Sequence, residues 1–171
     1  FDVRTKGEAV VEKLQQYPDA VDVTACVSPI TLPHSMWGRR YDGKDYRLNV
    51  WTVRYNLPEF FGIQMVDGTK FSEQSHSRNE MLVTSNLHSE IGISLGHVEN
   101  GHTICGMVKD VKLAPADDGI DYIALLCNSS RQFGTFYVKL KQGADIAAFS
   151  KYVRELVQEF APGADEPEVM F

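Results

Sequence analysis

The strongest constraint on the fold is an amphipathic pattern near the C-terminal end of the chain. Asp145 is placed to cap a helix at its N-terminus, and Pro162 and Gly163 are placed to end it. Between these signals the apolar residues recur every three or four positions, which is the period of an α-helix with one buried face. They are Ile146, Phe149, Val153, Leu156, Val157 and Phe160. This pattern predicts a helix over 146–160.

A second helix and a series of strands complete an α+β plan. The spacing of apolar residues predicts an N-terminal helix over 6–17, and strict alternation predicts a half-buried strand over 21–27. The run 122–127 is continuously apolar, which predicts a strand covered on both faces. Further elements are expected as strands at 46–54, 80–84, 103–111, 136–140 and 169–171, and as a short helix at 86–91.

Length and charge exclude several classes of protein. The 171 residues suit one domain or two small interlocked ones, and the net charge is -6. No run of cations exceeds the pair Arg39 and Arg40, so we expect no nucleic-acid partner. No segment reaches the roughly 18 consecutive apolar residues of a membrane span. The chain begins at Phe1 without a signal-peptide pattern, and we expect it to be part of a longer protein.

Three cysteines are too few for a disulfide framework. Cys26, Cys105 and Cys127 all lie among strand-like apolar residues, so we expect buried thiols. One disulfide among the three remains open in an oxidising compartment, and the sequence does not select the pair.

Two patterns resemble active sites but fail on spacing. Residues 92–96 read G-x-S-x-G, yet a helix is expected before Ser94 and a strand after it, the reverse of a nucleophile elbow. No acid and histidine follow at a suitable distance. The possible metal ligands lack the compact spacing of zinc sites; they are His88, His97, His102 and Cys105. Phosphate-binding glycine loops are absent from the sequence. We therefore expect no catalytic residue, no cofactor, no metal and no enzymatic activity.

One segment carries residue types that favour protein interfaces. Gly43 marks a hairpin turn, and the aromatic and basic residues before it form a candidate partner contact. They are Trp37, Arg39, Arg40 and Tyr41. The alternative is that these aromatic side chains, with Tyr46, pack on their own domain.

Three segments in this order resemble the periplasmic core domain of MacB-like, FtsX-like ABC transporter permeases. Residues 14–27, LQQYPDAVDVTACV, are similar to the family's helix, turn and first strand. Residues 60–71, FFGIQMVDGTKF, resemble its glycine-containing signature and are followed by EMLVTSNLHSEIG at 80–92. Residues 103–111, TICGMVKDV, resemble its V-x-G-V-v-k-D strand. Each motif is degenerate, so their order and spacing identify the resemblance.

The resemblance implies a divided α+β fold and a role in transport. A porter-like subdomain of the split βαβ, ferredoxin-like type would comprise residues 1–55 and 115–171, interrupted by a smaller inserted α+β subdomain at 56–114. A hinge would lie near Pro58 and Pro115. The domain would lie outside the cytoplasm, in the periplasm, between two helices of an inner-membrane permease.

The partners implied are those of such permeases. They are a cytoplasmic ATPase reached through membrane helices, a periplasmic adaptor or lipoprotein, and a second copy in a homodimer. The domain would transmit ATP-driven movement to the export of a peptide, toxin or lipoprotein, or to a partner protein. The alternative is a free-standing periplasmic ligand-binding or interaction module, which requires a deep pocket with converging polar groups.

Overall fold

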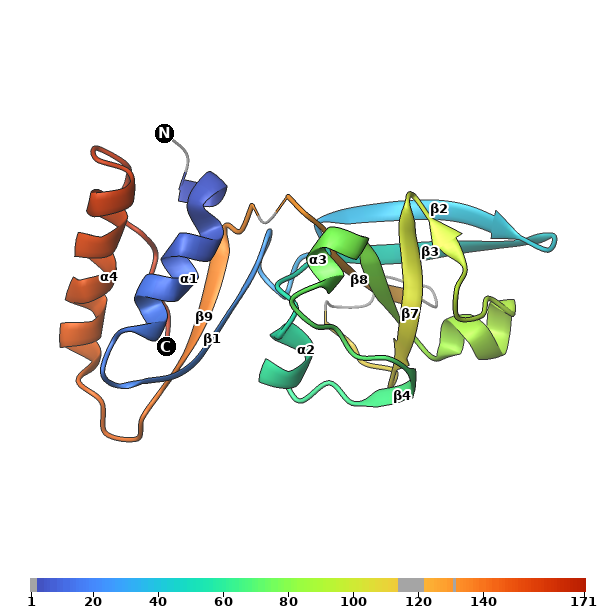
Figure 1. Ribbon diagram of the computed structural model, residues 1–171, viewed down its shortest axis with the longest axis horizontal. Helices are drawn as coiled ribbons and strands as arrows, with labels where there is room; N and C mark the ends of the chain where they lie inside the picture. The colour runs from blue at the N-terminus through green and yellow to red at the C-terminus, as the bar shows by residue number, and fades with distance from the viewer. Residues whose placement is uncertain (1–2, 114–121, 131) are drawn as a thin grey trace.

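Two lobes lie side by side along the long axis of the molecule (Figure 1). The computed structural model describes residues 3–113, 122–130 and 132–171, and its mixture of helices and strands confirms the α+β class. We call one lobe the helical lobe; it contains η1 (Val3–Lys6), α1 (Gly7–Gln15), β1 (Ala20–Cys26), β9 (Thr135–Leu140) and α4 (Ile146–Phe160). The remaining strands and short helices form the sheet lobe.

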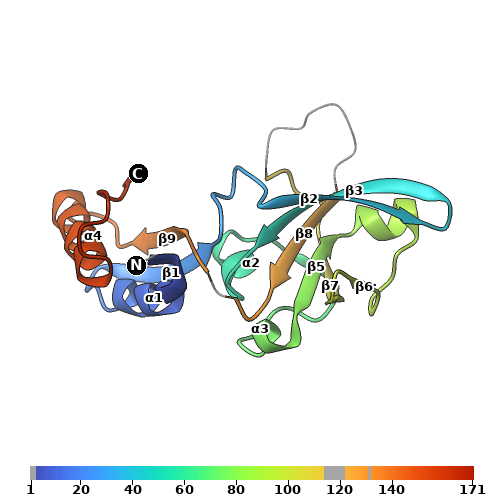
Figure 2. The same ribbon diagram turned by 90° about the horizontal axis from the view of Figure 1, so that it is seen from above.

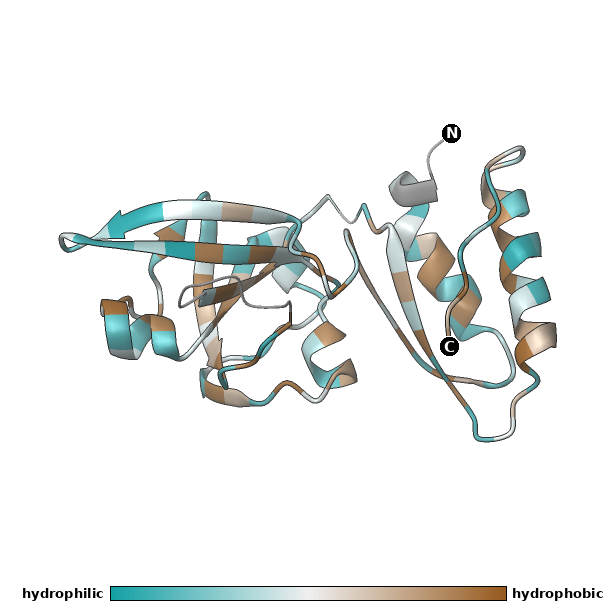
Figure 3. Cartoon of the chain, turned by 180° about the vertical axis from the view of Figure 1, so that it is seen from behind, coloured by the Kyte–Doolittle hydropathy of each residue, from teal (hydrophilic) through white to brown (hydrophobic). Residues whose placement is uncertain are grey.

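The helical lobe packs two helices on a small sheet. β1 pairs with β9 in an antiparallel two-stranded sheet, and α1 and α4 share a hydrophobic core with one face of it. Figure 3 shows the hydrophobic stripe of α1 beside the strands. The Asp145 carboxylate accepts a hydrogen bond from the Ala148 amide at 3.0 Å, which confirms the predicted N-cap. Both amphipathic helices predicted from the sequence are therefore present, and both bury their apolar faces here.

The sheet lobe is built on one seven-stranded mixed sheet. The strand order is β2-β3-β8-β5-β7-β4, with β6 also paired to β7; β3–β8 and β5–β7 are parallel pairs. The strands are β2 (Ser35–Tyr41), β3 (Lys44–Thr52), β4 (Met65–Gly68), β5 (Glu80–Thr84), β6 (Val98–Glu99), β7 (His102–Val108) and β8 (Tyr122–Cys127). The short helices are α2 (Leu57–Phe60), α3 (Ser75–Arg78) and the π-helical turn η2 (Leu87–Ile91).

β8 lies inside the sheet, between β3 and β5, and all of its residues are buried. Alternate side chains of β8 enter two hydrophobic cores, one on each face of the sheet. η2 contributes to one core and α2 to the other. The prediction of a strand covered on both faces is confirmed, because a central strand with two packed faces has no solvated side.

Strand pairing groups the elements into two sheets, one in each lobe. β2, β3 and β8, assigned from the sequence to the porter-like subdomain, lie in one sheet with the strands of segment 56–114, because β8 pairs with β5. The strands between β1 and β9 thus all belong to the sheet lobe. The pairing that joins the segments is between β5 and β8, which are distant in sequence, and local periodicity carries no information on such partners.

Two other expectations concern the C-terminal third. No strand is assigned at 169–171, so the expected closing strand is wrong; both Met170 and Phe171 are exposed. Pro115, placed near the expected hinge, lies outside the described residues. Among the residues that are described, no helix has the length and apolar character needed to cross a bilayer.

Two glycines allow β4 to approach β7 closely. Gly68 has a positive φ of 73°, and a Cβ built on it would lie 2.8 Å from Gly106 Cα. A Cβ on Gly106 would lie 2.7 Å from the Thr69 carbonyl oxygen. Backbone atoms cannot move aside as a flexible side chain can, so both positions require glycine. These glycines belong to two of the segments that carry the family resemblance.

We expect Gly106→Ala to lower the free energy of unfolding by about 1–3 kcal/mol, because the added methyl group overpacks the contact between β4 and β7. Urea unfolding followed by circular dichroism measures this. Gly38→Ala is the matched control: Gly38 is also a strand glycine with negative φ, but nothing lies within 4 Å of its Cβ position. Its free energy of unfolding should be unchanged or raised by up to about 1 kcal/mol. Equal losses for both variants would contradict the crowding at Gly106.

Candidate functional site

The candidate partner contact lies on a hairpin that extends away from the helical lobe (Figures 1 and 2). β2 and β3 are joined by the two-residue turn Asp42-Gly43, in which both residues have positive φ, 46° and 77°. This is the combination required by a type I′ turn, whose twist matches that of the strands. The hairpin predicted from Gly43 is therefore confirmed.

The structure places the four predicted contact residues on two different faces. Trp37, Arg39 and Tyr41 are half-buried on the face that packs against the sheet lobe. Arg40 points to the other side, where its side chain is 69% exposed and lies 3.5 Å from Asp45. The aromatic residues thus pack at least partly on their own lobe, as the alternative interpretation held, while Arg40 remains accessible.

One carboxylate holds the inner face of the hairpin in place. Glu99, from β6, accepts hydrogen bonds from Arg39 Nε at 2.9 Å and from the Tyr46 hydroxyl at 2.7 Å. His97 Nε2 lies 3.1 Å from the same carboxylate. The Arg39 guanidinium also lies 5.3 Å from the centre of the Trp37 ring, in cation–π contact. Hairpin and β6 are consequently joined by a set of polar contacts around Glu99.

The electrostatic environment keeps Glu99 ionised. Burial alone would raise the pKa of this carboxyl, but the hydrogen bonds from Tyr46, His97 and Arg39 outweigh burial and place the pKa below its ordinary value of 4.5. Burial and the nearby Glu99 carboxylate raise the pKa of Tyr46, so its hydroxyl remains a donor. The network is therefore a charge-assisted one at neutral pH.

We expect Glu99→Gln to lower the free energy of unfolding by about 1–3 kcal/mol at pH 7, because Arg39 loses its charged partner. The pKa of Glu99 is lower in the folded protein than in the unfolded chain. Its contribution to stability is therefore complete above the unfolded pKa and is lost as the pH falls through the folded pKa. The difference between the two proteins should thus shrink in acid. Urea titrations at several pH values measure it. Asp45→Asn, on the exposed face of the same hairpin, is the control and should change stability little.

A second cluster joins the two lobes, and a buried ion pair lies at its centre. Arg54, just after β3, is 6% exposed at its side chain, and its Nη2 and Nε donate to the Glu8 carboxylate of α1 at 2.7 and 3.0 Å. The Arg54 amide donates to the Ala25 carbonyl of β1 at 2.8 Å. Its guanidinium stacks 4.6 Å from the centre of the Tyr55 ring. We call this the interlobe joint; it is formed by residues 53–61 with α1, β1 and β9.

Further contacts extend the interlobe joint on both sides of Arg54. The Asn56 side chain accepts from the Thr24 hydroxyl and donates to the Val23 carbonyl, each at 2.8 Å. Lys139 of β9 donates to the Phe60 carbonyl at 2.6 Å and lies 4.3 Å from the centre of the Phe60 ring. Pro58, where a hinge was expected, is buried in this segment within α2.

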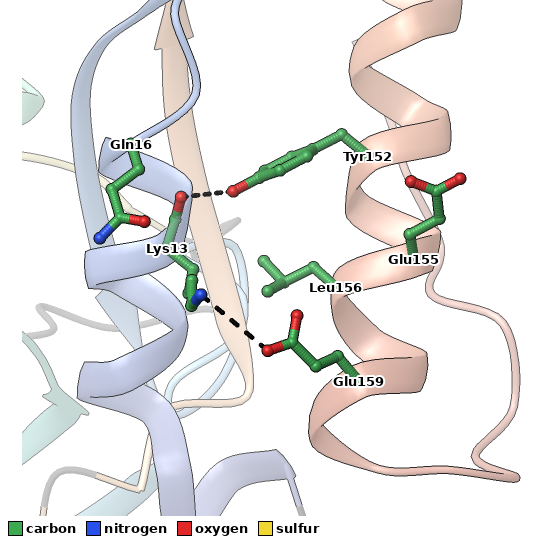
Figure 4. Close-up of a pocket in the computed structure, with 6 residues that line it drawn as sticks. All are labelled: Lys13, Gln16, Tyr152, Glu155, Leu156 and Glu159. Atoms are coloured by element: carbon green, nitrogen blue, oxygen red, sulfur yellow. Dashed lines mark hydrogen bonds and ion pairs between the residues drawn. The ribbon is translucent and has the colours of Figure 1, made fainter.

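A shallow groove lies between α1 and α4 (Figure 4). Its volume is about 390 Å³, and its lining residues are Lys13, Gln16, Tyr152, Glu155, Leu156 and Glu159. The Tyr152 hydroxyl donates to the Lys13 carbonyl at 2.6 Å, and Lys13 Nζ lies 3.9 Å from Glu159. Its polar groups thus partly satisfy one another, and they fasten α1 to α4 instead of converging on a ligand.

Solved structures with a similar fold include regions of a MacB protein, of an ABC-type transporter and of a permease. The periplasmic region of MacB from Actinobacillus actinomycetemcomitans is 16% identical, with a TM-score of 0.60 over 89% of this chain and 72% of that one. This is the fold of the MacB periplasmic region. The fold prediction from the three sequence segments is confirmed.

Two further structures share the MacB-like fold. The extracellular domain of the noncanonic ABC-type transporter YknZ from Gram-positive bacteria is 15% identical, with a TM-score of 0.67 over 93% of this chain and 85% of that one. A domain of a candidate permease from Porphyromonas gingivalis is 17% identical, with a TM-score of 0.59 over 88% and 76%. No protein-family model and no curated protein matches the sequence.

The features that resembled active sites have structural roles in this MacB-like fold. Ser94 is exposed, follows η2 and precedes β6, so the order of elements is the reverse of a nucleophile elbow, as expected. His88 Nδ1 lies 2.9 Å from the Ile93 carbonyl in the same turn. Among the described residues, no three His, Cys, Asp or Glu side chains are grouped closely enough to hold a metal ion.

The cysteines are three free thiols. Cys26 and Cys127 are buried, and Cys105 is half-buried. Burial raises the pKa of Cys26 and of Cys105 to about 12, so both remain protonated at neutral pH and are poor nucleophiles. The expectation of buried thiols is confirmed for Cys26 and Cys127.

Sequence reasoning missed the charged residues on which both clusters depend. Arg54 offered a signal, since it directly follows the largely apolar run at 50–53, and a cation in such a place needs a partner when buried. Glu8 and Glu99 offered none, because each is an acidic residue in a polar stretch. Their roles follow from contacts between segments far apart in the sequence.

Proposed function

We propose that this chain is an extracytoplasmic domain of an ABC-type transporter permease. The observation that carries the proposal is the coincidence of its two-lobed fold with the MacB and YknZ regions over 89% and 93% of the chain. The order and spacing of the three sequence segments support it independently. On this proposal the domain lies in the periplasm or its equivalent, held by membrane helices of the parent protein.

In this role the domain does not catalyse a reaction. ATP hydrolysis would take place in a separate cytoplasmic ATPase, and the domain would convert movements of the membrane helices into export of a peptide, toxin or lipoprotein, or into control of a partner. The parent would act as a homodimer. The division into a porter-like and an inserted unit belongs to this proposal, with the boundaries placed where the two sheets divide the chain. The shallow groove between α1 and α4 does not favour the alternative of a ligand-binding module.

The hairpin is proposed as the contact for an adaptor or lipoprotein partner. Its outer face presents Arg40 and Met36, which are exposed and not needed for packing. Glu99 anchors its inner face, so the hairpin is held in one orientation before any partner binds. A preorganised surface of this kind loses little conformational entropy on association.

The gene that encodes the chain tests the proposed location. We expect an apolar segment of about 20 residues before Phe1 and further ones after Phe171, beside a gene for an ATPase with a phosphate-binding loop. The physical reason is that a mechanical domain must be tied to the membrane on both sides. Sequencing the reading frame and its neighbours measures this. A frame with a cleavable signal that closes near Phe171 would replace the permease with a free-standing module.

Photo-crosslinking tests the proposed contact. With a photoreactive amino acid in place of Arg40 in the full-length protein in its membrane, we expect an adduct with a partner protein. The same substitution at Lys151, on the exposed face of α4 in the helical lobe, is the control and should give none. Adducts of the same kind from both positions, or none from position 40, would contradict a partner site on the hairpin.

A further inference from the structure

An ion pair crosses from the sheet lobe to the first turn of α1. We infer that Glu8 and Arg54 form a clasp that fixes the angle between the two lobes. The fixed angle itself is a property of the fold, whereas its use in passing movement from α1 to the sheet lobe rests on the proposed function.

The geometry distinguishes this pair from an ordinary surface ion pair. Two nitrogens of Arg54 bind the same carboxylate, and the side chains of Arg54 and Glu8 are only 6% and 27% exposed. Another ion pair of α1, between Lys13 and Glu159, is 3.9 Å long with both side chains well exposed. A forked pair shielded from water is directional, and removal of one partner leaves a buried charge.

Both ends of the clasp are attached to rigid parts. Arg54 follows β3 directly, and its amide is bonded to β1, so its backbone cannot swing away from the helical lobe. Glu8 lies in α1, which Tyr152 fastens to α4. A rotation of the sheet lobe away from α1 would be opposed by this pair together with the backbone hydrogen bond from Arg54 to Ala25.

Further contacts between the lobes lie near Pro58, where a hinge was expected. The segment around Pro58 is bonded to β1 through Asn56 and to β9 through Lys139. These contacts join the lobes alongside the ion pair. With the clasp closed, we expect the described part of the molecule to move as one body.

Amide hydrogen exchange tests this directly in the 171-residue chain. Two amides form hydrogen bonds between the lobes: Arg54 to the Ala25 carbonyl, and Val27 to the Thr52 carbonyl. Two others report on single lobes: Phe149 in α4, and Thr69 beside β7. We compare Glu8→Gln, which keeps the shape of the side chain and removes its charge, with Glu12→Gln on the exposed side of the same helix.

We expect the Arg54 and Val27 amides to exchange roughly tenfold faster or more in Glu8→Gln, as loss of a charge-assisted contact implies. Phe149 and Thr69 should stay within about twofold of the unmodified protein, and Glu12→Gln should change none of the four. Equal acceleration of all four amides, or no acceleration of the interlobe pair, would overturn the clasp. Either result would leave the permease proposal standing, because that is decided by the flanking gene sequence.

Discussion

One stretch of chain, from Lys44 to Phe61, contributes to the sheet lobe, to the contacts around Glu99 and to the interlobe joint. Its first half is β3, which pairs with β2 on one side and with β8 on the other and contributes Tyr46 to the contacts around Glu99. Its second half leaves the sheet and lies against α1, β1 and β9. Where this backbone passes from one lobe to the other, its buried N–H and C=O groups need hydrogen-bond partners. Arg54 and Asn56 satisfy them at the crossing.

Local periodicity was sufficient to locate most elements. The helices at both ends, the hairpin turn and the buried β8 were all predicted, because each follows from the spacing of apolar residues or from a glycine with positive φ. The grouping of the strands into one sheet depends on long-range pairings such as that of β3 with β8. These strands are separated by most of the sheet lobe in sequence, and no pattern within either one specifies the other. The apolar residues at 169–171 matched a strand by composition, yet they have no pairing partner.

The site was predicted less completely than the fold. Residue type alone identified the hairpin, but the alternation of β2 then divides its residues between two faces, with Arg39 turned to Glu99 and Arg40 turned to solvent. Burial gives Glu99 and Arg54 their importance, and burial depends on tertiary packing. The glycine motifs were recognised by resemblance alone. The structure explains why glycine is needed in them, because Gly68 and Gly106 each leave room for the other's backbone.

The parallel pairing of β3 with β8 has a consequence for the order of folding. The centre of the sheet lobe is incomplete until residues 122–127 are available, and the helical lobe needs β9 and α4, which follow later still. Neither lobe has a core that the first two thirds of the chain can close alone. Contacts of such long sequence separation slow folding, since the chain must meet itself across a large loop. During synthesis the chain therefore reaches its native structure late, after nearly all of it has left the ribosome.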